Sequence, residues 1–420
     1  IVVVQPRRIA ARMLARRVAE VRGTSLGEEI GYVVRFENHM GKCTRVVYLT
    51  DGVLQRWLHE NPTLDGIGAV VFDEFHERRV ASDVALARCM NLQDGKRPDL
   101  KLVVMSATLE VQGLQGYLEP CVMLEADGRM FPVEVSYRGA GAPPVGGRQA
   151  PAIWDRVADA VRDAVSSDEA GHVLVFLPGV HEICRTAELI ERAGWSRGWD
   201  VCPLFSGLPP AQQDAAVAAG GKPRIIVSTN VAETSLTIDG VRTVIDSGLA
   251  RVSNHDSARG IDTLMIEKIS RASADQRAGR AGRTALGRCI RLWSENDHAK
   301  RAGFELPEIQ RIDLSEVLLS LFAVGVRDVA GFRWLSPPDA CALQRAMELL
   351  VQLGAVDRHG IITDVGQQMA GFPLHPRYAR LLLSGAEYDC VAEAGFIAAA
   401  VQSEGVFVRG KGGRKEFSDD

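Results

Sequence analysis

The chain of 420 residues has 46% hydrophobic and 24% charged residues and a formal net charge of −4, an ordinary composition for a globular protein. This length allows two to four domains with substantial cores. The slightly negative charge excludes a basic field over the whole molecule, so any nucleic-acid binding must come from local clusters of arginine. No apolar run reaches the ~18–20 residues of a membrane helix, so we expect neither a signal peptide nor membrane contact.

Eight cysteines are scattered along the chain, and none of them forms a CxxC pair. The sequence therefore predicts neither a zinc site nor a dithiol redox centre. We expect the cysteines to be buried thiols of a protein in the reducing cytoplasm. The chain opens on Ile1 and directly on an apolar run, so we interpret it as an internal piece of a longer protein.

The first part of the chain alternates short apolar runs with amphipathic stretches. We expect buried parallel strands at Ile1–Val4, Arg45–Leu49, Gly68–Phe72 and Lys101–Met105. Helical spacing occurs in Arg7–Arg22, Asp51–Glu60 and Val80–Met90. This alternation predicts a parallel sheet that is covered by helices.

A Gly/Pro-rich stretch, 138–151, interrupts this pattern and is predicted to be a linker. A second set of strands is expected at His172–Leu177, Val201–Leu204, Arg224–Ser228, Arg242–Asp246 and Arg288–Trp293. Alternating runs in Leu249–Ser270 predict a hairpin that projects from this second set. Beyond about residue 300 the strands thin out, and helical spacing occurs in Leu314–Ala323, Asp339–Leu353 and Tyr378–Ala386. The sequence thus predicts two α/β layers in tandem, followed by a helical region.

The sharpest local signal is the run from Val70 to His76, in which an apolar strand delivers Asp73 and Glu74 to its carboxyl end. Open α/β sheets bind ligands at that edge. Of two adjacent acids, one can hold Mg²⁺, usually through water, while the other orients or deprotonates an attacking water. A charged turn after a strand is the alternative, and this short motif alone does not separate the two.

A second motif, Gln276–Arg283, places Arg280 and Arg283 three residues apart, so that they would share one face of a helix. Two guanidinium groups on one face suit a polyphosphate. Gly279 and Gly282 would keep the neighbouring surface bare for a close approach. The alternative is a solvated basic helix, although two glycines inside it would cost roughly 1 kcal/mol each relative to alanine.

Two further segments directly follow predicted strands. Ser228–Ile238 carries hydroxyl and amide side chains that could grip phosphates and sugars, or could cap a helix through Thr229 or Asn230. The other segment, Ser106-Ala107-Thr108, carries little information by itself.

Arginines gather at the first predicted strand-to-helix junction, where Gln5-Pro6-Arg7-Arg8 is followed by Arg12, Arg16 and Arg17. Beside the positive N-terminus of a helix, they form a natural site for backbone phosphates. Thr50-Asp51-Gly52 repeats this geometry after the next strand. For either feature alone, a solvated helix face is the favoured alternative.

The order of these motifs resembles that of the DEAH/RHA family of superfamily 2 helicases, and the resemblance covers essentially the whole chain. The motifs are Gln-Pro-Arg-Arg (5–8), Thr-Asp-Gly (50–52), Asp-Glu-Phe-His (73–76), Ser-Ala-Thr (106–108), Thr-Asn-Val-Ala-Glu-Thr-Ser-Leu-Thr-Ile (229–238) and Gln-Arg-Ala-Gly-Arg-Ala-Gly-Arg (276–283). The details are similar to those of the bacterial HrpB branch. These details are Asp-Glu-Phe-His, Phe-Leu-Pro-Gly (176–179), Asp-Ser-Gly-Leu-Ala-Arg-Val (246–252) and Pro-Leu-His-Pro-Arg (373–377).

The resemblance implies an α/β fold of two tandem RecA-like parallel-sheet domains, followed by a winged-helix and helical region. The implied bounds are 1–137 for a first, N-terminally truncated RecA-like domain, 138–298 for the second, 299–378 for the winged-helix-like domain and 379–420 for the start of a helical bundle. The implied cofactors are ATP and Mg²⁺, and the implied partner is single-stranded RNA or DNA, gripped through its backbone. Movement along the strand would run 3′ to 5′, and RNA is the expected substrate, although the sequence leaves DNA open.

The resemblance also implies a role for each motif. Asp73 and Glu74 would hold Mg²⁺ and ATP, with Glu74 as the catalytic base. His76 and Gln276 would couple the nucleotide site to the second domain, and Arg280 and Arg283 would be arginine fingers on the γ-phosphate. Ser106, Ala107 and Thr108 would link hydrolysis to strand movement, and Arg17 would stack on the nucleotide base, with its aromatic partner replaced near Leu249. The strand's backbone would meet Pro6, Arg7, Arg8, Thr50, Asp51, Gly52, Gly179, Thr229 and Asn230.

One family motif does not occur in the chain. The Gly-x-Gly-Lys-Thr loop that holds the phosphates is expected before Ile1, and neither Gly41-Lys42-Cys43 nor Gly220-Gly221-Lys222-Pro223 has its pattern. We therefore expect this piece to bind ATP poorly even if the longer protein is active. Two alternatives stay open: a non-catalytic RNA- or ribosome-binding scaffold that has kept the fold, and an ATPase that remodels protein–RNA complexes without processive unwinding.

Overall fold

The computed structural model describes residues 1–107, 111–126, 128, 131–139, 151–166, 171–218, 220–234, 238–256 and 261–402. The chain divides into two compact units, Ile1–Ile312 and Asp313–Asp420. The first unit contains two α/β lobes, each built around one six-stranded sheet.

The first lobe is built on a sheet with the strand order β3-β2-β4-β1-β5-β6. Its strands are β1 (Val2–Gln5), β2 (Ile30–Val34), β3 (Glu37–His39), β4 (Val46–Thr50), β5 (Ala69–Phe72) and β6 (Lys101–Val104). All neighbours pair in parallel except β2 and β3. The helices are α1 (Arg8–Arg22), α2 (Asp51–Glu60), α3 (Val80–Asp94) and α4 (Val111–Leu118), with a 3-10 turn, η1 (Phe75–Glu77). Because β1, β4, β5 and β6 run in parallel, their carboxyl ends meet at one edge.

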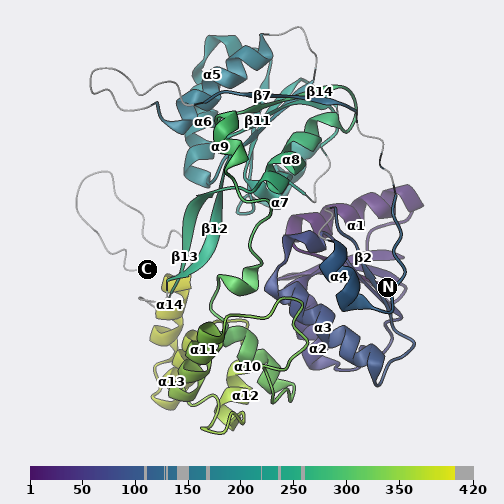
Figure 1. Ribbon diagram of the computed structural model, residues 1–420, viewed down its shortest axis with the longest axis vertical. Coiled ribbons are helices and arrows are strands. Elements are labelled where there is room, and N and C mark those ends of the chain that lie inside the picture. Colours follow the sequence, from purple (N-terminus) through teal and green to yellow (C-terminus); the bar gives the residue numbers. More distant parts are fainter. Residues whose placement is uncertain are drawn as a thin grey trace, which may run out of the picture. The chain divides into compact units, whose positions relative to one another are not determined.

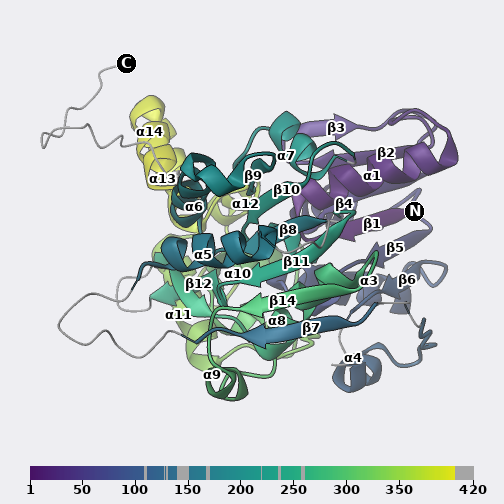
Figure 2. The ribbon, with the colours of Figure 1, turned by 90° about the horizontal axis from the view of Figure 1, so that it is seen from above.

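The second lobe has the strand order β7-β14-β11-β8-β10-β9, and every pairing in it is parallel (Figure 2). Its strands are β7 (Val133–Tyr137), β8 (His172–Phe176), β9 (Asp200–Leu204), β10 (Arg224–Ser228), β11 (Val241–Asp246) and β14 (Gly287–Arg291). Its helices and 3-10 turns are α5 (Ile153–Val165), α6 (Val180–Arg192), η2 (Gly194–Ser196), α7 (Pro210–Val217), η3 (Asn230–Ala232), α8 (Arg271–Gly279), η4 (Arg280–Gly282), α9 (Glu295–Ala299) and η5 (Glu308–Gln310).

Residues of β8 alternate between the two faces of the second sheet. Val173 and Val175 belong to a core cluster with residues of α5 and α6, whereas Leu174 and Phe176 belong to a cluster with residues of α7 and α8. This alternation is the two-residue period of a strand that is buried on both faces. The second cluster also includes Ile9 of α1, so the first helix of the chain contributes to the core of the second lobe.

An antiparallel hairpin of β12 (Leu249–Asp256) and β13 (Ile261–Lys268) belongs to neither large sheet (Figure 1). Its outer residues Leu264 and Met265 are exposed. The hairpin predicted from Leu249–Ser270 is therefore confirmed.

The second unit is helical over its described residues, which end at Gln402 (Figure 1). It contains α10 (Ser315–Ala323), α11 (Ala340–Gln352), α12 (Asp364–Ala370), α13 (Pro376–Glu387) and α14 (Val391–Gln402), with one isolated bridge between Val356 and Ile362. His375 caps α13 by accepting the Arg377 N–H at Nδ1, and its Nε2 lies 3.4 Å from Asp313 Oδ1. None of the described helices is long and apolar enough to cross a membrane.

The expected strands and helices are confirmed, with differences of a few residues at their ends. Two strands of the first sheet, β2 and β3, were not expected. Gly31 in β2 is the signal that sequence reasoning missed, because a Cβ there would lie 2.4 Å from the carbonyl oxygen of His39 in the paired strand. Another difference concerns the expected domain boundary at residue 138. Val133–Tyr137 precedes it but forms β7, which pairs with β14 and therefore belongs to the second sheet.

Truncation of the β8 core should destabilise the second lobe. We expect Leu174→Ala to lower the free energy of unfolding by about 2–5 kcal/mol, because the side chain is 1% exposed and its truncation leaves a cavity in the core. Leu286→Ala is the matched control, since Leu286 is 61% exposed, and should change the value by less than about 0.5 kcal/mol. Urea unfolding monitored by circular dichroism measures both, and equal losses would contradict the packing described here.

Candidate active site

Asp73 and Glu74 lie where β5 ends at the carboxyl edge of the first sheet. Asp73 is held by two hydrogen bonds: Gln5 Nε2 donates to Oδ2 at 2.7 Å and the Glu74 backbone N–H donates to Oδ1 at 2.8 Å. Glu74 has φ 51° and ψ 37°, the left-handed region that non-glycine residues seldom adopt. Such backbone conformations concentrate at functional sites, and this one turns the chain sharply into η1.

Burial raises the pKa of Glu74 to about 7, and the neighbouring charges of Asp73 and then Glu77 add to the rise. Arg280 and Arg283 of the second lobe act in the opposite direction on the same carboxyl. The acids of one lobe and the arginines of the other therefore lie within electrostatic reach of each other. A carboxyl group with a pKa near 7 is suited to accept a proton at neutral pH.

His76 connects the acid turn to the segment after β6. The backbone N–H of Ala107 donates to His76 Nδ1 at 3.3 Å, so the neutral imidazole carries its proton on Nε2. That nitrogen lies 3.5 Å from Glu74 Oε2, and burial lowers the pKa of His76. His76 thus joins the acid turn to Ala107 of the Ser-Ala-Thr motif, a contact that the sequence did not indicate. Ser106 is exposed, and Thr108 lies outside the described residues. The coupling roles expected for His76 and for the Ser-Ala-Thr motif stay predictions.

Arg280 and Arg283 were expected to share a face of one helix, but α8 ends at Gly279 and Arg280 opens the 3-10 turn η4. Arg280 Nε donates to the carbonyl oxygen of Glu233 at 2.7 Å, and its Nη2 donates to that of Thr234. Burial, and next the charge of Arg283, lowers the pKa of Arg280. Burial likewise lowers the pKa of Arg283. Two close guanidinium groups in a partly desolvated position favour an anion between them.

Arg277 of the same motif has a different environment and was not among the expected site residues. Its side chain is 1% exposed, with Nε 2.8 Å from Glu233 Oε2 and Nη1 2.9 Å from Asp246 Oδ1. Its guanidinium lies 4.8 Å from the ring centroid of Phe176, and Ser273 donates to the other oxygen of Glu233 at 2.6 Å. These contacts attach α8 to the turn after β10 and thereby position Arg280.

Gly282 is small for a reason other than the one expected. A Cβ at this position would lie 2.4 Å from the carbonyl oxygen of Phe131 and 2.8 Å from Val133. The glycine therefore permits close packing against the segment that leads into β7, and the expectation that it clears space for a ligand is wrong.

The residues expected to bind a strand in the first lobe follow β1 and β4. Arg7 Nη1 donates to Asn230 Oδ1 at 3.2 Å, so it joins the first lobe to the second, whereas Arg8 is exposed and lies 3.7 Å from Glu37. Pro6 accepts a hydrogen bond from Arg79 through its carbonyl oxygen.

The turn after β4 is largely buried. Thr50 and Asp51 are both buried, and Asp51 Oδ2 lies 3.3 Å from Arg79 Nε, while its Oδ1 accepts the Gly52 N–H at 2.8 Å. In this conformation Asp51 pairs with an arginine of the protein, which leaves Gly52 as the open position of the motif: a Cβ there would meet nothing within 4 Å.

The expected strand-binding residues of the second lobe follow β8 and β10. Thr229 caps the short turn η3 through its hydroxyl, which confirms the capping interpretation, and Asn230 contacts Arg7. Gly179 precedes α6, and a Cβ there would lie 2.7 Å from Arg251 Nε of the hairpin. Arg251 thus lies over Gly179, a neighbour that the sequence did not indicate.

Two further residues, Arg17 and Gln276, are expected at the nucleotide. Arg17 is 72% exposed on α1 and lies 3.6 Å from Glu20, which is a surface contact. Gln276 is half-buried on α8. Their roles stay predictions.

Three segments match known protein families. Residues 156–285 match the helicase conserved C-terminal domain, 346–374 the winged-helix part of the helicase associated domain (HA2), and 375–418 its ratchet-like part. The crystal structure of the Escherichia coli DEAH/RHA helicase HrpB matches 96% of this chain with a TM-score of 0.87 and 38% identity. The chain belongs to the DEAH/RHA helicase family.

Curated relatives of this DEAH/RHA protein match along almost its whole length. Human "Probable ATP-dependent RNA helicase DHX35" is 36% identical over 430 residues, covering 97% of this chain and 60% of the relative. Escherichia coli "ATP-dependent RNA helicase HrpA" is 38% identical over 404 residues, covering 94% of this chain and 30% of the relative. The chain thus spans between about a third and about three fifths of these relatives, and 51% of the solved HrpB chain.

Further contacts join the two lobes of the DEAH/RHA core through residues that sequence reasoning missed. Arg12 of α1 is buried, and its Nη2 donates to Gln213 Oε1 at 2.9 Å and to Asp214 Oδ1 at 3.2 Å. Arg16 Nη1 donates to Asp214 Oδ2 at 2.8 Å. The sequence offered a backbone-phosphate site or a solvated helix face for this arginine cluster, and Arg12 and Arg16 instead bind Asp214 on α7.

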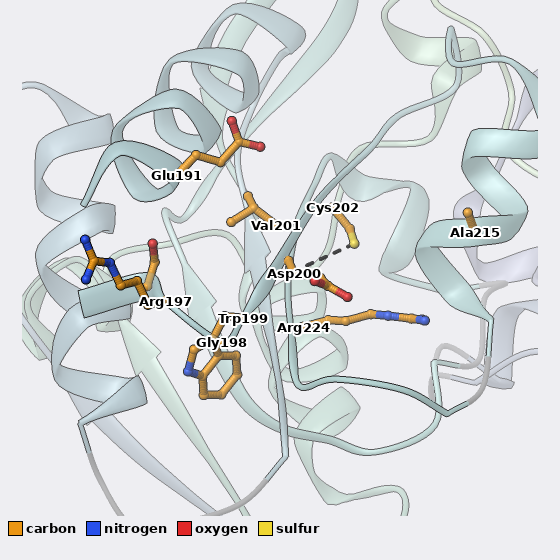
Figure 3. Close-up of a pocket in the computed structure, with 10 residues that line it drawn as sticks. Glu191, Arg197, Gly198, Trp199, Asp200, Val201, Cys202, Ala215 and Arg224 are labelled. Carbon is orange, nitrogen blue, oxygen red and sulfur yellow. Dashed lines mark hydrogen bonds between the residues drawn. The ribbon is translucent and has the colours of Figure 1, made fainter. Parts of the chain in front are cut away.

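A hollow of about 690 Å³ lies beside the edge strand β9, apart from these motifs (Figure 3). Trp199, Asp200, Cys202 and Arg224 line it, and no residue of the expected site does. The hollow is therefore separate from the candidate active site at the acid and arginine turns.

Loss of the Arg277 charge should be strongly destabilising. Arg277→Met would leave Glu233 and Asp246 buried without their cation, and we expect the free energy of unfolding to fall by about 3–5 kcal/mol. The exposed Arg197 provides the control, because Arg197→Met should change stability by less than about 0.5 kcal/mol. Chemical denaturation measures both, and a stable Arg277→Met protein would contradict the role given to this network.

Proposed function

We propose that the protein containing this chain is a helicase that hydrolyses ATP to move along a single strand, 3′ to 5′, and to unwind duplexes or remodel RNA–protein complexes. One observation carries the proposal: Arg280 and Arg283 of the second lobe lie close enough to Glu74 of the first for their charges to lower the pKa of its carboxyl group. The names of its relatives, ATP-dependent RNA helicases, support the same reaction class with RNA as the strand.

The roles divide between the lobes. Glu74 accepts the proton of the attacking water, and His76 holds Glu74 and the Ala107 segment in one arrangement. Arg280 and Arg283 stabilise the charge that develops on the transferred phosphoryl group, a contribution that reaches 10³–10⁵ in rate in other phosphate-transfer enzymes. The turn contacts of Arg280 with Glu233 and Thr234 carry any movement of the finger into the segment after β10.

The acid pair fits Mg²⁺ in the company of a triphosphate. Among the residues that the structure describes, no group of three His, Cys, Asp or Glu side chains could hold a metal alone. Each oxygen of Asp73 accepts one hydrogen bond and keeps a lone pair, and Mg²⁺ ordinarily takes one or two carboxylates with phosphates and water. Asp73, aided by Glu74, would hold the ion, which would neutralise phosphate charge.

In this proposal, Arg7, Gly52, Gly179 and Asn230 contact the single strand. Most of the contacts are made to the sugar-phosphate backbone of the nucleic acid. Binding of this kind is weakly sequence-specific and weakens as salt rises, because it releases counterions. We propose that the protein acts in the cytoplasm.

The catalytic base is tested in the full-length protein that contains this chain. We expect the wild type to show ATP hydrolysis strongly stimulated by single-stranded RNA or DNA, and Glu74→Gln to fall to near background because the amide cannot accept the proton. The control is Glu188→Gln on the exposed face of α6, which makes the same chemical change and should keep wild-type turnover. Wild-type turnover in Glu74→Gln would exclude Glu74 as the base, and a folded wild type that does not hydrolyse ATP with or without nucleic acid would favour the non-catalytic scaffold.

The same carboxyl predicts a pH dependence. Since its pKa is about 7 in the free protein and the base must be deprotonated, kcat/KM should rise with pH through 7. We expect roughly a tenfold loss for each pH unit below the pKa. A kcat/KM profile that is flat between pH 6 and 8 would contradict this assignment.

A further inference from the structure

Glu77, at the end of η1, joins the acid turn to two other segments that the proposed function uses, the one after β1 and the one after β10. Arg7 Nε and Nη2 donate to its two carboxylate oxygens at 3.3 Å each, which is a bidentate pair. The hydroxyl of Thr234 in the second lobe donates to Glu77 Oε1 at 2.7 Å. One carboxylate therefore binds both lobes.

Glu77 is charged in this arrangement. Burial alone would raise its pKa, but Arg7, the Thr234 hydroxyl and Arg79 outweigh that effect and hold the pKa below its usual value. The side chains of Arg7 and Glu77 are only 21% and 15% exposed, so the pair is better protected from solvent than a surface ion pair.

Both hydrogen-bond partners of Glu77 also contact residues of the proposed strand site or active site. Arg7 also donates to Asn230, so it is shared between Glu77 and a residue expected to face the strand. Thr234 offers its carbonyl oxygen to Arg280 Nη2. Glu77 itself lies three residues after Glu74 on the same tight turn, and its charge is among the causes of the raised pKa of that carboxyl.

We propose that Glu77 is a positioning residue that makes hydrolysis depend on the strand, an inference that rests on the proposed function. Without a strand, Glu77 holds the guanidinium of Arg7. A backbone phosphate of the strand competes with the Glu77 carboxylate for that guanidinium, because phosphate and carboxylate are both anions that a guanidinium can bind through two hydrogen bonds. When the phosphate takes Arg7, Glu77 keeps its contact with Thr234 and the acid turn adjusts relative to Arg280.

The proposal predicts that a substitution of Glu77 changes strand affinity and strand-stimulated hydrolysis in opposite directions. Removing the charge of Glu77 frees Arg7, so the strand should bind more tightly. The same change breaks the link from strand to acid turn, so the strand should stimulate hydrolysis less. A residue needed only for folding would weaken both.

The test uses the full-length protein, a fluorescent single-stranded RNA and ATP hydrolysis with and without that RNA. We expect Glu77→Gln to bind the strand about two- to fivefold more tightly, the equivalent of one weak ion pair, and to lose at least about four fifths of the stimulation ratio. Thr234→Val should lose stimulation with wild-type strand affinity, and Thr234→Ser, which keeps the hydroxyl, should restore it. Glu188→Gln is the matched control and should behave as the wild type.

The outcomes separate this inference from the proposed function. Unchanged or weaker strand binding by Glu77→Gln, or full stimulation in Thr234→Val, overturns the role of Glu77 while the helicase proposal stands. A wild type that hydrolyses ATP without any response to RNA or DNA overturns the proposed coupling, and the binding arm still decides whether Glu77 restrains Arg7. If Glu77→Gln does not fold, the pair Thr234→Val and Thr234→Ser decides the question.

Discussion

The electrostatic meeting of Glu74 with Arg280 and Arg283 is the constraint on which the rest of the site depends. Burial disfavours the charged form of each of these groups. It raises the pKa of the Glu74 carboxyl and lowers the pKa of both guanidinium groups. A triphosphate with its cation supplies the missing charges: anionic oxygens for the arginines and a positive ion for the acids. The site is therefore built to gain most from the ligand on which it is proposed to act.

One motif combines structural and chemical arginines. Arg277 is buried between Glu233 and Asp246, and this pairing fixes α8 on the sheet. Arg280 then leaves the helix through a 3-10 turn and is steered by backbone carbonyls of the segment after β10. Similar side chains three residues apart thus have opposite tasks, because one is fully paired within the fold and the others face an acid across the lobes.

The sequence predicted the two α/β lobes and the acid turn, because those rest on local patterns: apolar runs of strand length and acids directly after them. It did not predict partners that are distant along the chain. Glu77 and Thr234 are 157 residues apart, and each looks like an ordinary turn residue by itself. For Arg12 and Arg16 the sequence left a backbone-phosphate site and a solvated helix face open, because nothing local indicates Asp214. Gly282 was misjudged for the same reason, since its close neighbour is the distant Phe131.

The most direct measurement is a crystal structure of the full-length protein with a non-hydrolysable ATP analogue and Mn²⁺, located by anomalous scattering. The account predicts the Mn²⁺ peak beside the Asp73 carboxylate, with the terminal phosphate between Glu74 and the guanidinium groups of Arg280 and Arg283. A nucleotide bound in the hollow beside β9, or a terminal phosphate beyond hydrogen-bonding reach of both arginines, would contradict it.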